Sequence, residues 1–123
     1  MRGRGDRPQY WILIGQTAVP MDPQPDGDTP EGVQALLEWS SHFEMDERRV
    51  MLDDLGPGYS VSTVFLGIDH GWLGPEPLLF ETAVAAGGSW DIVGRWSTWA
   101  EAEEGHKAAV VECRAAREKA LRG

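Results

Sequence analysis

The sequence lacks the features that would assign the protein to a membrane or an extracellular class. Its 123 residues include a single cysteine, Cys113, so no disulfide can form within the chain, which agrees with a reducing compartment. No apolar run approaches the roughly 20 residues of a membrane-spanning helix, and no signal-peptide-like segment follows the N-terminal arginines. We therefore expect a cytoplasmic protein that makes no membrane contact.

Basic residues are also scarce. The chain has 11 Lys and Arg against 20 Asp and Glu, which gives a net charge of −9. Most of the excess negative charge lies in residues 22–54, which contain ten acidic residues and only two basic ones, Arg48 and Arg49, for a local charge of −8. Because nucleic-acid binding depends on basic side chains that neutralise phosphates, we expect no direct contact with nucleic acid. The acidic surface suits a basic partner, or serves only to keep the protein in solution.

Recognised catalytic motifs are missing as well. Gly56-Pro-Gly58 and Gly87-Gly88 lack the Lys-Ser/Thr pair of a phosphate-binding loop. The sequence has no Gly-x-Ser-x-Gly elbow and no HExxH or CxxC spacing. This pattern favours a non-enzymatic protein that carries no cofactor.

What the sequence does contain is a strand-rich centre. Residues 59–70 and 77–84 are rich in β-branched and aromatic side chains, and turn-forming residues fill positions 69–76, which predicts two strands and a loop. A symmetric pairing places Leu66 opposite Phe80. The face expected in the core then carries Val64, Leu66, Ile68, Leu78, Phe80 and Val84.

Three further strands are expected around this pair. Residues 10–14 are expected to form one that ends at Gly15. Residues 48–55 could continue a helix, but a strand is favoured because a Gly-Pro-Gly turn follows, and this strand and residues 90–96 flank the central pair. Residues 19–28 are rich in proline and are expected to form an extended loop. The expected register places Ile92 beside Phe80, Trp90 beside Val84, and Glu81 on the same outer face as Arg95.

Two helices have clear start signals. Thr29, followed by Pro30 and Glu31, predicts a helix that ends near residue 41 or 42. Thr98 and Glu101 have the form of a capping box and predict a long C-terminal helix. Its core-facing stripe is expected to consist of Trp99, Ala102, His106, Ala109, Val110, Cys113 and Ala120.

Together these elements predict one two-layer α+β domain over residues 9–123, after a flexible lead-in at residues 1–8. Its centre is an antiparallel β-meander of about four to five strands. Two helices complete it, with the C-terminal helix packed on the sheet.

Two histidines and two acids are the candidates for chemistry. Asp69 and His70 stand where a strand enters a glycine-rich loop. His70, Glu81 and His106 are the types of residue that bind a metal, and the set also offers a His–carboxylate acid–base pair. Each has a structural alternative, with His106 packed in the core, Glu81 paired with Arg95, and Asp69 stabilising its turn.

A partner-binding surface is the other candidate. Trp72 lies between glycines in the 69–76 loop, where it either anchors an interface or folds back over its own hairpin. We expect it to bind a partner together with the acidic residues Glu44, Asp46, Glu47, Asp53 and Asp54.

Three blocks of sequence occur in a specific order: Val61-Ser-Thr-Val-Phe-Leu-Gly-Ile-Asp-His70, Pro77-Leu-Leu-Phe-Glu-Thr82 and Arg95-Trp-Ser-Thr-Trp-Ala-Glu-Ala-Glu-Glu-Gly-His106. Together they resemble a family of small proteins encoded by bacteriophages and prophages. The resemblance implies a product made in the cytoplasm of the bacterial host. The leading hypothesis is therefore an accessory protein that binds a host or defence-system protein as an inhibitor or modulator, with mimicry by its acidic surface as one route.

Two alternatives stay open at this point. One is a small metal-dependent or acid–base enzyme centred on Asp69, His70, Glu81 and His106. The other is a minor component of the virion or of its assembly. The sequence is also compatible with a homodimer.

Overall fold

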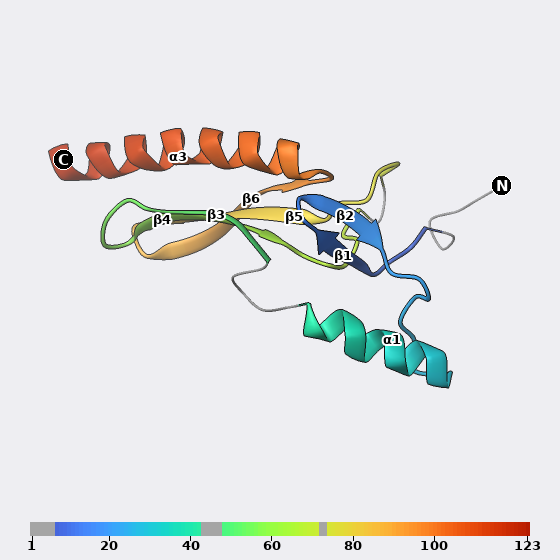
Figure 1. Cartoon of the computed structure of the whole chain (residues 1–123). Coiled ribbons are helices and arrows are strands. Elements are labelled where there is room, and N and C mark those ends of the chain that lie inside the picture. The colour runs from blue at the N-terminus through green and yellow to red at the C-terminus, as the bar shows by residue number, and fades with distance from the viewer. Residues whose placement is uncertain (1–6, 43–47, 72–73) are drawn as a thin grey trace.

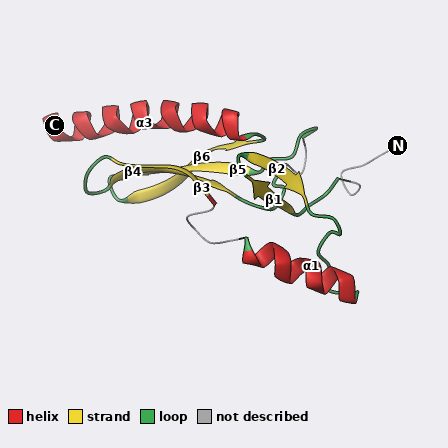
Figure 2. Cartoon of the chain, in the orientation of Figure 1, coloured by secondary structure: helices red, strands yellow, loops and turns green. Residues whose placement is uncertain are grey.

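Two antiparallel sheets and two helices make up the described part of the chain, which in this computed structural model is residues 7–42, 48–71 and 74–123 (Figure 1). The elements in chain order are β1 (Trp11–Ile14), β2 (Thr17–Pro20), α1 (Pro30–Ser41), β3 (Arg49–Asp54), β4 (Tyr59–Phe65), β5 (Phe80–Ala86), β6 (Ser89–Trp96) and α3 (Trp99–Arg122). The smaller sheet pairs β1 with β2, and the larger sheet has the order β3-β4-β5-β6. Figure 2 shows α3 lying along one face of the larger sheet, which confirms the predicted α+β fold.

Both helices begin where the capping signals predict. The Thr29 hydroxyl accepts a hydrogen bond from the backbone N–H of Gly32 at 2.9 Å, and α1 ends at Ser41. At the start of α3, the Thr98 hydroxyl accepts from the backbone N–H of Glu101 at 3.1 Å. These bonds satisfy amides that have no partner within the helix, so a local signal is enough to fix each helix start.

The predicted stripe on α3 packs on the sheet, with one exception. Ala102, Ala109 and Cys113 are buried with His106 and Val110, so small side chains let the helix approach the strands closely. Ala120 is exposed because the last turns of α3 extend past the end of the sheet (Figure 1). The core has two parts, one around Val61 and Val110 and one around Phe65, Leu79, Phe80 and Ala102.

The predicted register of the central strands is wrong by one residue. Phe65, not Leu66, lies opposite Phe80, and Thr63 lies opposite Thr82. Because side chains alternate across a strand, a shift of one residue exchanges the two faces of β4. The physical reason is that Thr63 and Thr82 are fully buried in the core, whereas a count of apolar residues assigns Thr to the outer face.

The predicted register of the last strand is also wrong. Trp96 lies opposite Phe80, and the pairing shifts between Thr82 and Ala83 because an extra residue is accommodated in β6. Trp90 and Ile92 therefore lie on the face away from α3, where both are more than half exposed, at 57% and 55%. The predicted pairing of Glu81 with Arg95 is confirmed, since the two are cross-strand neighbours with their carboxylate and guanidinium 3.1 Å apart.

The N-terminal strand belongs to a small hairpin. The predicted strand at residues 10–14 is present, but part of the expected loop that follows forms β2, which pairs with β1 around Gly15 at a φ of +64°. The hairpin attaches to the segment after β4, where the backbone N–H of Trp11 donates to the carbonyl of Gly67 at 2.8 Å. This attachment places Trp11 and Leu13 against the Phe65 part of the core.

Trp39 attaches α1 to the hairpin. Its indole N–H lies 3.2 Å from the carbonyl oxygen of Trp11 and 3.1 Å from that of Gly67. The Trp39 ring also meets the Tyr10 ring edge to face, with centroids 5.0 Å apart. Figure 1 shows α1 on the side of the sheet away from α3 and beyond one end of it, so α1 leaves most of that face uncovered.

Trp96 is held between two glycines. A Cβ atom at Gly94 on β6 or at Gly105 on α3 would overlap the Trp96 ring. Glycine in the middle of a helix normally costs about 1 kcal/mol relative to alanine. Gly105 is therefore explained by the close approach of the indole and not by any turn of the backbone.

Gly105→Ala is expected to destabilise the protein by about 1–3 kcal/mol, because the added methyl group displaces the Trp96 ring and this overpacking outweighs the gain in helix propensity. Urea denaturation followed by circular dichroism measures the change. Gly27→Ala is the matched control, since a Cβ at Gly27 meets nothing within 4 Å. A Gly105→Ala variant as stable as the control would contradict this account of the packing.

Candidate functional site

The structure does not bring the predicted metal ligands together. Within the described ranges, no group of three or more His, Cys, Asp or Glu side chains is arranged to hold a metal ion. His70 Nδ1 donates to the backbone carbonyl of Ile68 at 2.9 Å, and Glu81 is paired with Arg95. His106 has other partners, so the predicted set of His70, Glu81 and His106 is separated into three local arrangements.

Asp69 stabilises its own loop. Its carboxylate accepts from the backbone N–H of Gly71 at 2.6 Å and from that of Leu78 at 3.0 Å. The Arg7 guanidinium pairs with the other carboxylate oxygen at 2.6 Å. Asp69 thus ties the loop after β4 to the segment before β5 and to the N-terminal segment, which is the structural alternative that the sequence offered.

His106 lies at the centre of a buried chain of hydrogen bonds. Its Nδ1 is 2.7 Å from the Thr63 hydroxyl, and its Nε2 is 2.7 Å from a carboxylate oxygen of Asp53. Thr63 and Thr82 share a hydrogen bond of 2.7 Å, and the Trp96 indole N–H donates to Thr82 at 3.0 Å. This chain of hydrogen bonds therefore crosses all four strands of the larger sheet and includes α3.

The direction of this chain follows from its ends. An indole N–H only donates, and within the described residues the Thr82 hydroxyl has no partners besides Trp96 and Thr63. Thr82 must then donate to Thr63, and Thr63 to Nδ1 of His106, which leaves the ring hydrogen on Nε2 to donate to Asp53. A second ring hydrogen on Nδ1 would leave the hydroxyl hydrogen of either Thr63 or Thr82 without an acceptor.

These contacts make His106 a structural residue. Its side chain is completely buried and both ring nitrogens are occupied, whereas the Asp53 side chain is 38% exposed. A substrate has no access to either nitrogen in this arrangement. A carboxylate from β3, which the sequence assigned to a partner surface, instead completes the hydrogen bonding of the core histidine.

Cys113 is a core residue, as the sequence predicts. It is buried, and its Sγ lies 3.5 Å from the backbone carbonyl of Ala85. Burial raises the pKa of its thiol, so the thiolate form that acts as a nucleophile is disfavoured.

The predicted partner-binding residues are not gathered on one described surface. Trp72, Glu44, Asp46 and Glu47 lie outside the described residues. Asp53 and Asp54 are neighbours on β3 and point to opposite faces, since Asp53 reaches His106 while Asp54 accepts from the backbone N–H of Gly56 at 3.0 Å.

A groove of about 900 Å³ lies at the other end of the molecule, between the β1–β2 hairpin, the segment before β5 and the first turns of α3. Trp11, Leu79 and Trp99 give it apolar walls. The Trp11 indole is held by a hydrogen bond to the carbonyl of Pro8 at 2.9 Å, and the Trp99 ring packs against Phe80 edge to face at 6.2 Å. The aromatic walls are thus fixed by contacts made outside the groove.

The groove is acidic. Glu76, Glu101 and Glu103 line it, and none of the described lining residues is Lys, Arg or His. The start of α3 contributes only about half a positive charge from its exposed amides, so three carboxylates outweigh it. The groove therefore has a negative potential over two indole rings, which is an arrangement that attracts a cation.

The groove has no signature in the sequence because its residues come from three separate segments. Trp11 and Trp99 were expected only as parts of a strand and of a helix stripe, and Glu101 only as part of a capping box. The only local signal is the pair of acids, Glu101 and Glu103, that follows Trp99. The docking of the β1–β2 hairpin, which closes the groove, has no signature in the sequence.

No protein-family model, no curated protein and no solved structure matches the chain. In the part of the chain that the structure describes, neither helix has the length and apolar composition needed to cross a lipid bilayer.

Thr63→Val is expected to destabilise the protein by about 2–4 kcal/mol, because it leaves Nδ1 of His106 without a donor and the Thr82 hydroxyl hydrogen without an acceptor. The double variant Thr63→Val, Thr82→Val also leaves two buried polar groups without a hydrogen-bond partner, namely Nδ1 of His106 and the Trp96 indole N–H. We expect its stability to be close to that of Thr63→Val alone. Denaturant titration of the two single variants and the double variant tests this, and additive losses would refute the proposed chain.

Proposed function

We propose that this protein is a non-enzymatic binding protein that takes a lysine- or arginine-containing segment of a partner protein into the acidic groove. The observation that carries the proposal is the groove itself, in which Trp11 and Trp99 stand beside three carboxylates and no basic side chain is found among the described lining residues. A basic side chain has both of the features that such a site recognises. Its charged end pairs with carboxylates, and its alkyl stem packs on an indole ring.

The magnitudes indicate what kind of ligand is needed. An exposed ion pair contributes about 0.2–1 kcal/mol, and a cation over an indole ring about 0.5–2 kcal/mol. A single basic side chain therefore falls well short of the roughly 8 kcal/mol that corresponds to micromolar affinity. An extended segment with two or three basic residues, whose stems also cover the two indoles, fits the groove better than an isolated cation.

The resemblance to bacteriophage and prophage proteins suggests the identity of the partner. We propose that it is a protein of the bacterial host or of its defence systems, met in the host cytoplasm and modulated by occupation of a basic segment. The negative potential of the groove and the net charge of −9 oppose binding of a phosphate backbone. A host protein that uses the same basic segment to bind nucleic acid would be blocked by this contact.

The enzyme alternative loses its proposed residues to other contacts, because Asp69, Glu81 and His106 each have structural partners. The virion alternative predicts that the protein copurifies with particles, and no observation on the described residues favours it.

Isothermal titration calorimetry with a blocked peptide that alternates arginine and glycine is the direct test. The groove variant Glu76→Gln, Glu103→Gln is expected to bind between about 2- and 30-fold more weakly, because it removes two carboxylates at about 0.2–1 kcal/mol each. Higher salt should weaken binding to the unaltered protein.

The matched control is Glu112→Gln, Glu118→Gln, which removes the same charge from exposed positions on α3 outside the groove. This control variant is expected to bind the peptide nearly as well as the unaltered protein. Equal weakening by both double variants would show that overall charge, and not the groove, attracts the peptide.

A further inference from the structure

The face of the larger sheet away from α3 is organised in three rows of cross-strand neighbours. The pairings of the four strands place each row across β3, β4, β5 and β6 in turn. The rows are, first, Asp54, Ser60, Ala85 and Trp90; second, Leu52, Ser62, Ala83 and Ile92; third, Arg49, Val64, Glu81 and Arg95.

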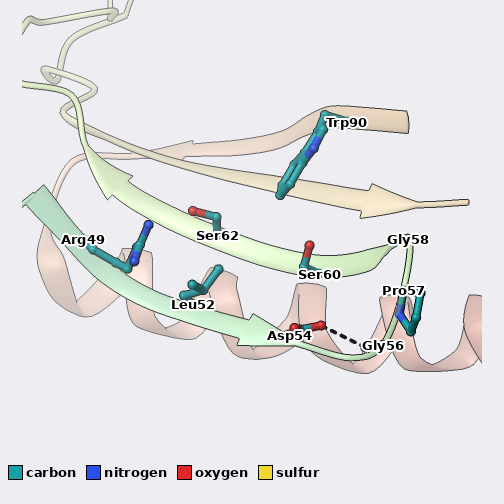
Figure 3. Close-up of a pocket in the computed structure, with 9 residues that line it drawn as sticks. All are labelled: Arg49, Leu52, Asp54, Gly56, Pro57, Gly58, Ser60, Ser62 and Trp90. Carbon is teal, nitrogen blue, oxygen red and sulfur yellow. Dashed lines mark hydrogen bonds between the residues drawn. The ribbon is translucent and has the colours of Figure 1, made fainter. Parts of the chain in front are cut away.

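This face is a trough. Its floor is made of the small side chains of Ser60 and Ser62 on β4 and of their alanine neighbours on β5, while larger side chains stand on both edge strands. Figure 3 shows Leu52 and Arg49 on one side of the hollow and Trp90 on the other, with α3 behind the sheet. The hollow has a volume of about 670 Å³.

The apolar residues at the edges of the trough are unusually exposed. Leu52, Trp90 and Ile92 are 48%, 57% and 55% accessible. Exposed apolar side chains that gather around a hollow mark an interaction surface more often than scattered ones do.

The charge of this face identifies the occupant. Among the described residues of the three rows, Arg49 and Arg95 balance Asp54 and Glu81, so the face is neutral in a chain of net charge −9. Two copies of the chain repel each other over most of their surfaces, but not here. Nε of Arg49 is also buried without an acceptor among the described residues, so an additional acceptor is needed at this point.

We infer that two copies of this protein pack face to face through the trough, related by a two-fold axis that crosses the strands at the middle row. Packed sheets keep their strand directions within about 30° of each other, so the facing rows stay aligned near the axis. The middle row then faces its own copy, with Leu52 against Leu52 and Ile92 against Ile92. The first row faces the third row of the second copy.

This arrangement is self-complementary in charge. Arg49 of each copy faces Asp54 of the second copy, and Trp90 faces Arg95 of the second copy, an indole against a guanidinium. A two-fold interface requires this kind of match, because the same patch must be complementary to itself.

The size of the face sets the strength of the contact. Four strands about 4.8 Å apart and three rows about 7 Å apart give on the order of 400 Å² of sheet surface per copy. This is below the roughly 800 Å² per partner of a standard interface, so the dimer is expected to dissociate in the micromolar range.

Sedimentation velocity from about 1 µM to about 1 mM, a range that brackets a micromolar dissociation constant, tests the inference with two charge variants. Arg49→Glu places two acids opposite each other, and Asp54→Arg places two arginines opposite each other. Each variant alone is expected to dimerise at least about tenfold more weakly than the unaltered protein. An equimolar mixture is expected to form a heterodimer, because both contacts then join opposite charges.

Ile92→Lys is a second test of the interface, because it places two lysines next to each other at the two-fold axis. The substitution removes no side-chain hydrogen bond or ion pair. Its matched control is Val111→Lys, an exposed apolar position on α3. Thermal melts within a few degrees of the unaltered protein would show that all these variants fold. The inference is overturned by an unaltered protein that stays monomeric, by a dimer that withstands Ile92→Lys, or by charge variants that fail to pair when mixed. Peptide binding in the groove is expected to be unchanged by Ile92→Lys, so the two proposals fail separately.

Discussion

The hydrogen-bond chain from Trp96 to Asp53 is the constraint on which the rest of the structure depends. Each strand of the larger sheet supplies one member and α3 supplies His106, so strand registers, helix depth and ring orientation are fixed by the same bonds. An indole N–H at one end and a carboxylate at the other give the chain a single direction. The buried polar groups of this hydrogen-bond chain are all satisfied in that direction, which makes the arrangement specific as well as stable.

The same chain of hydrogen bonds explains which structural features could be predicted from the sequence. Both helix starts depend on a hydroxyl three residues from the amide that it caps, so Thr29 and Thr98 could be recognised locally. The register of β4 and β5 depends instead on burying Thr63 against Thr82. A pattern of apolar residues does not predict that a polar residue lies in the core. Asp53, read as a surface acid, has its partner 53 residues away on α3.

The candidate site was harder to predict than the fold, for a related reason. His106 was correctly placed on the core stripe of the last helix, and Glu81 was correctly paired with Arg95. The acidic groove needs Trp11 beside Trp99, and that contact exists only after the β1–β2 hairpin has docked on the segment that follows β4. The small side chains that form the floor of the trough likewise come together only when the strands pair in this register.

The two helices are held very differently. α3 buries five residues against the sheet, whereas α1 buries only Gly32 and Ala35, and Trp39 attaches α1 to the hairpin through its ring and its indole N–H. Free energies of local opening follow the buried contacts of each segment, so we expect α1 to form a separate cooperative unit that opens without global unfolding. The amide hydrogens of α1 should therefore exchange with solvent through this partial opening, while those of α3 should exchange only when the larger sheet unfolds.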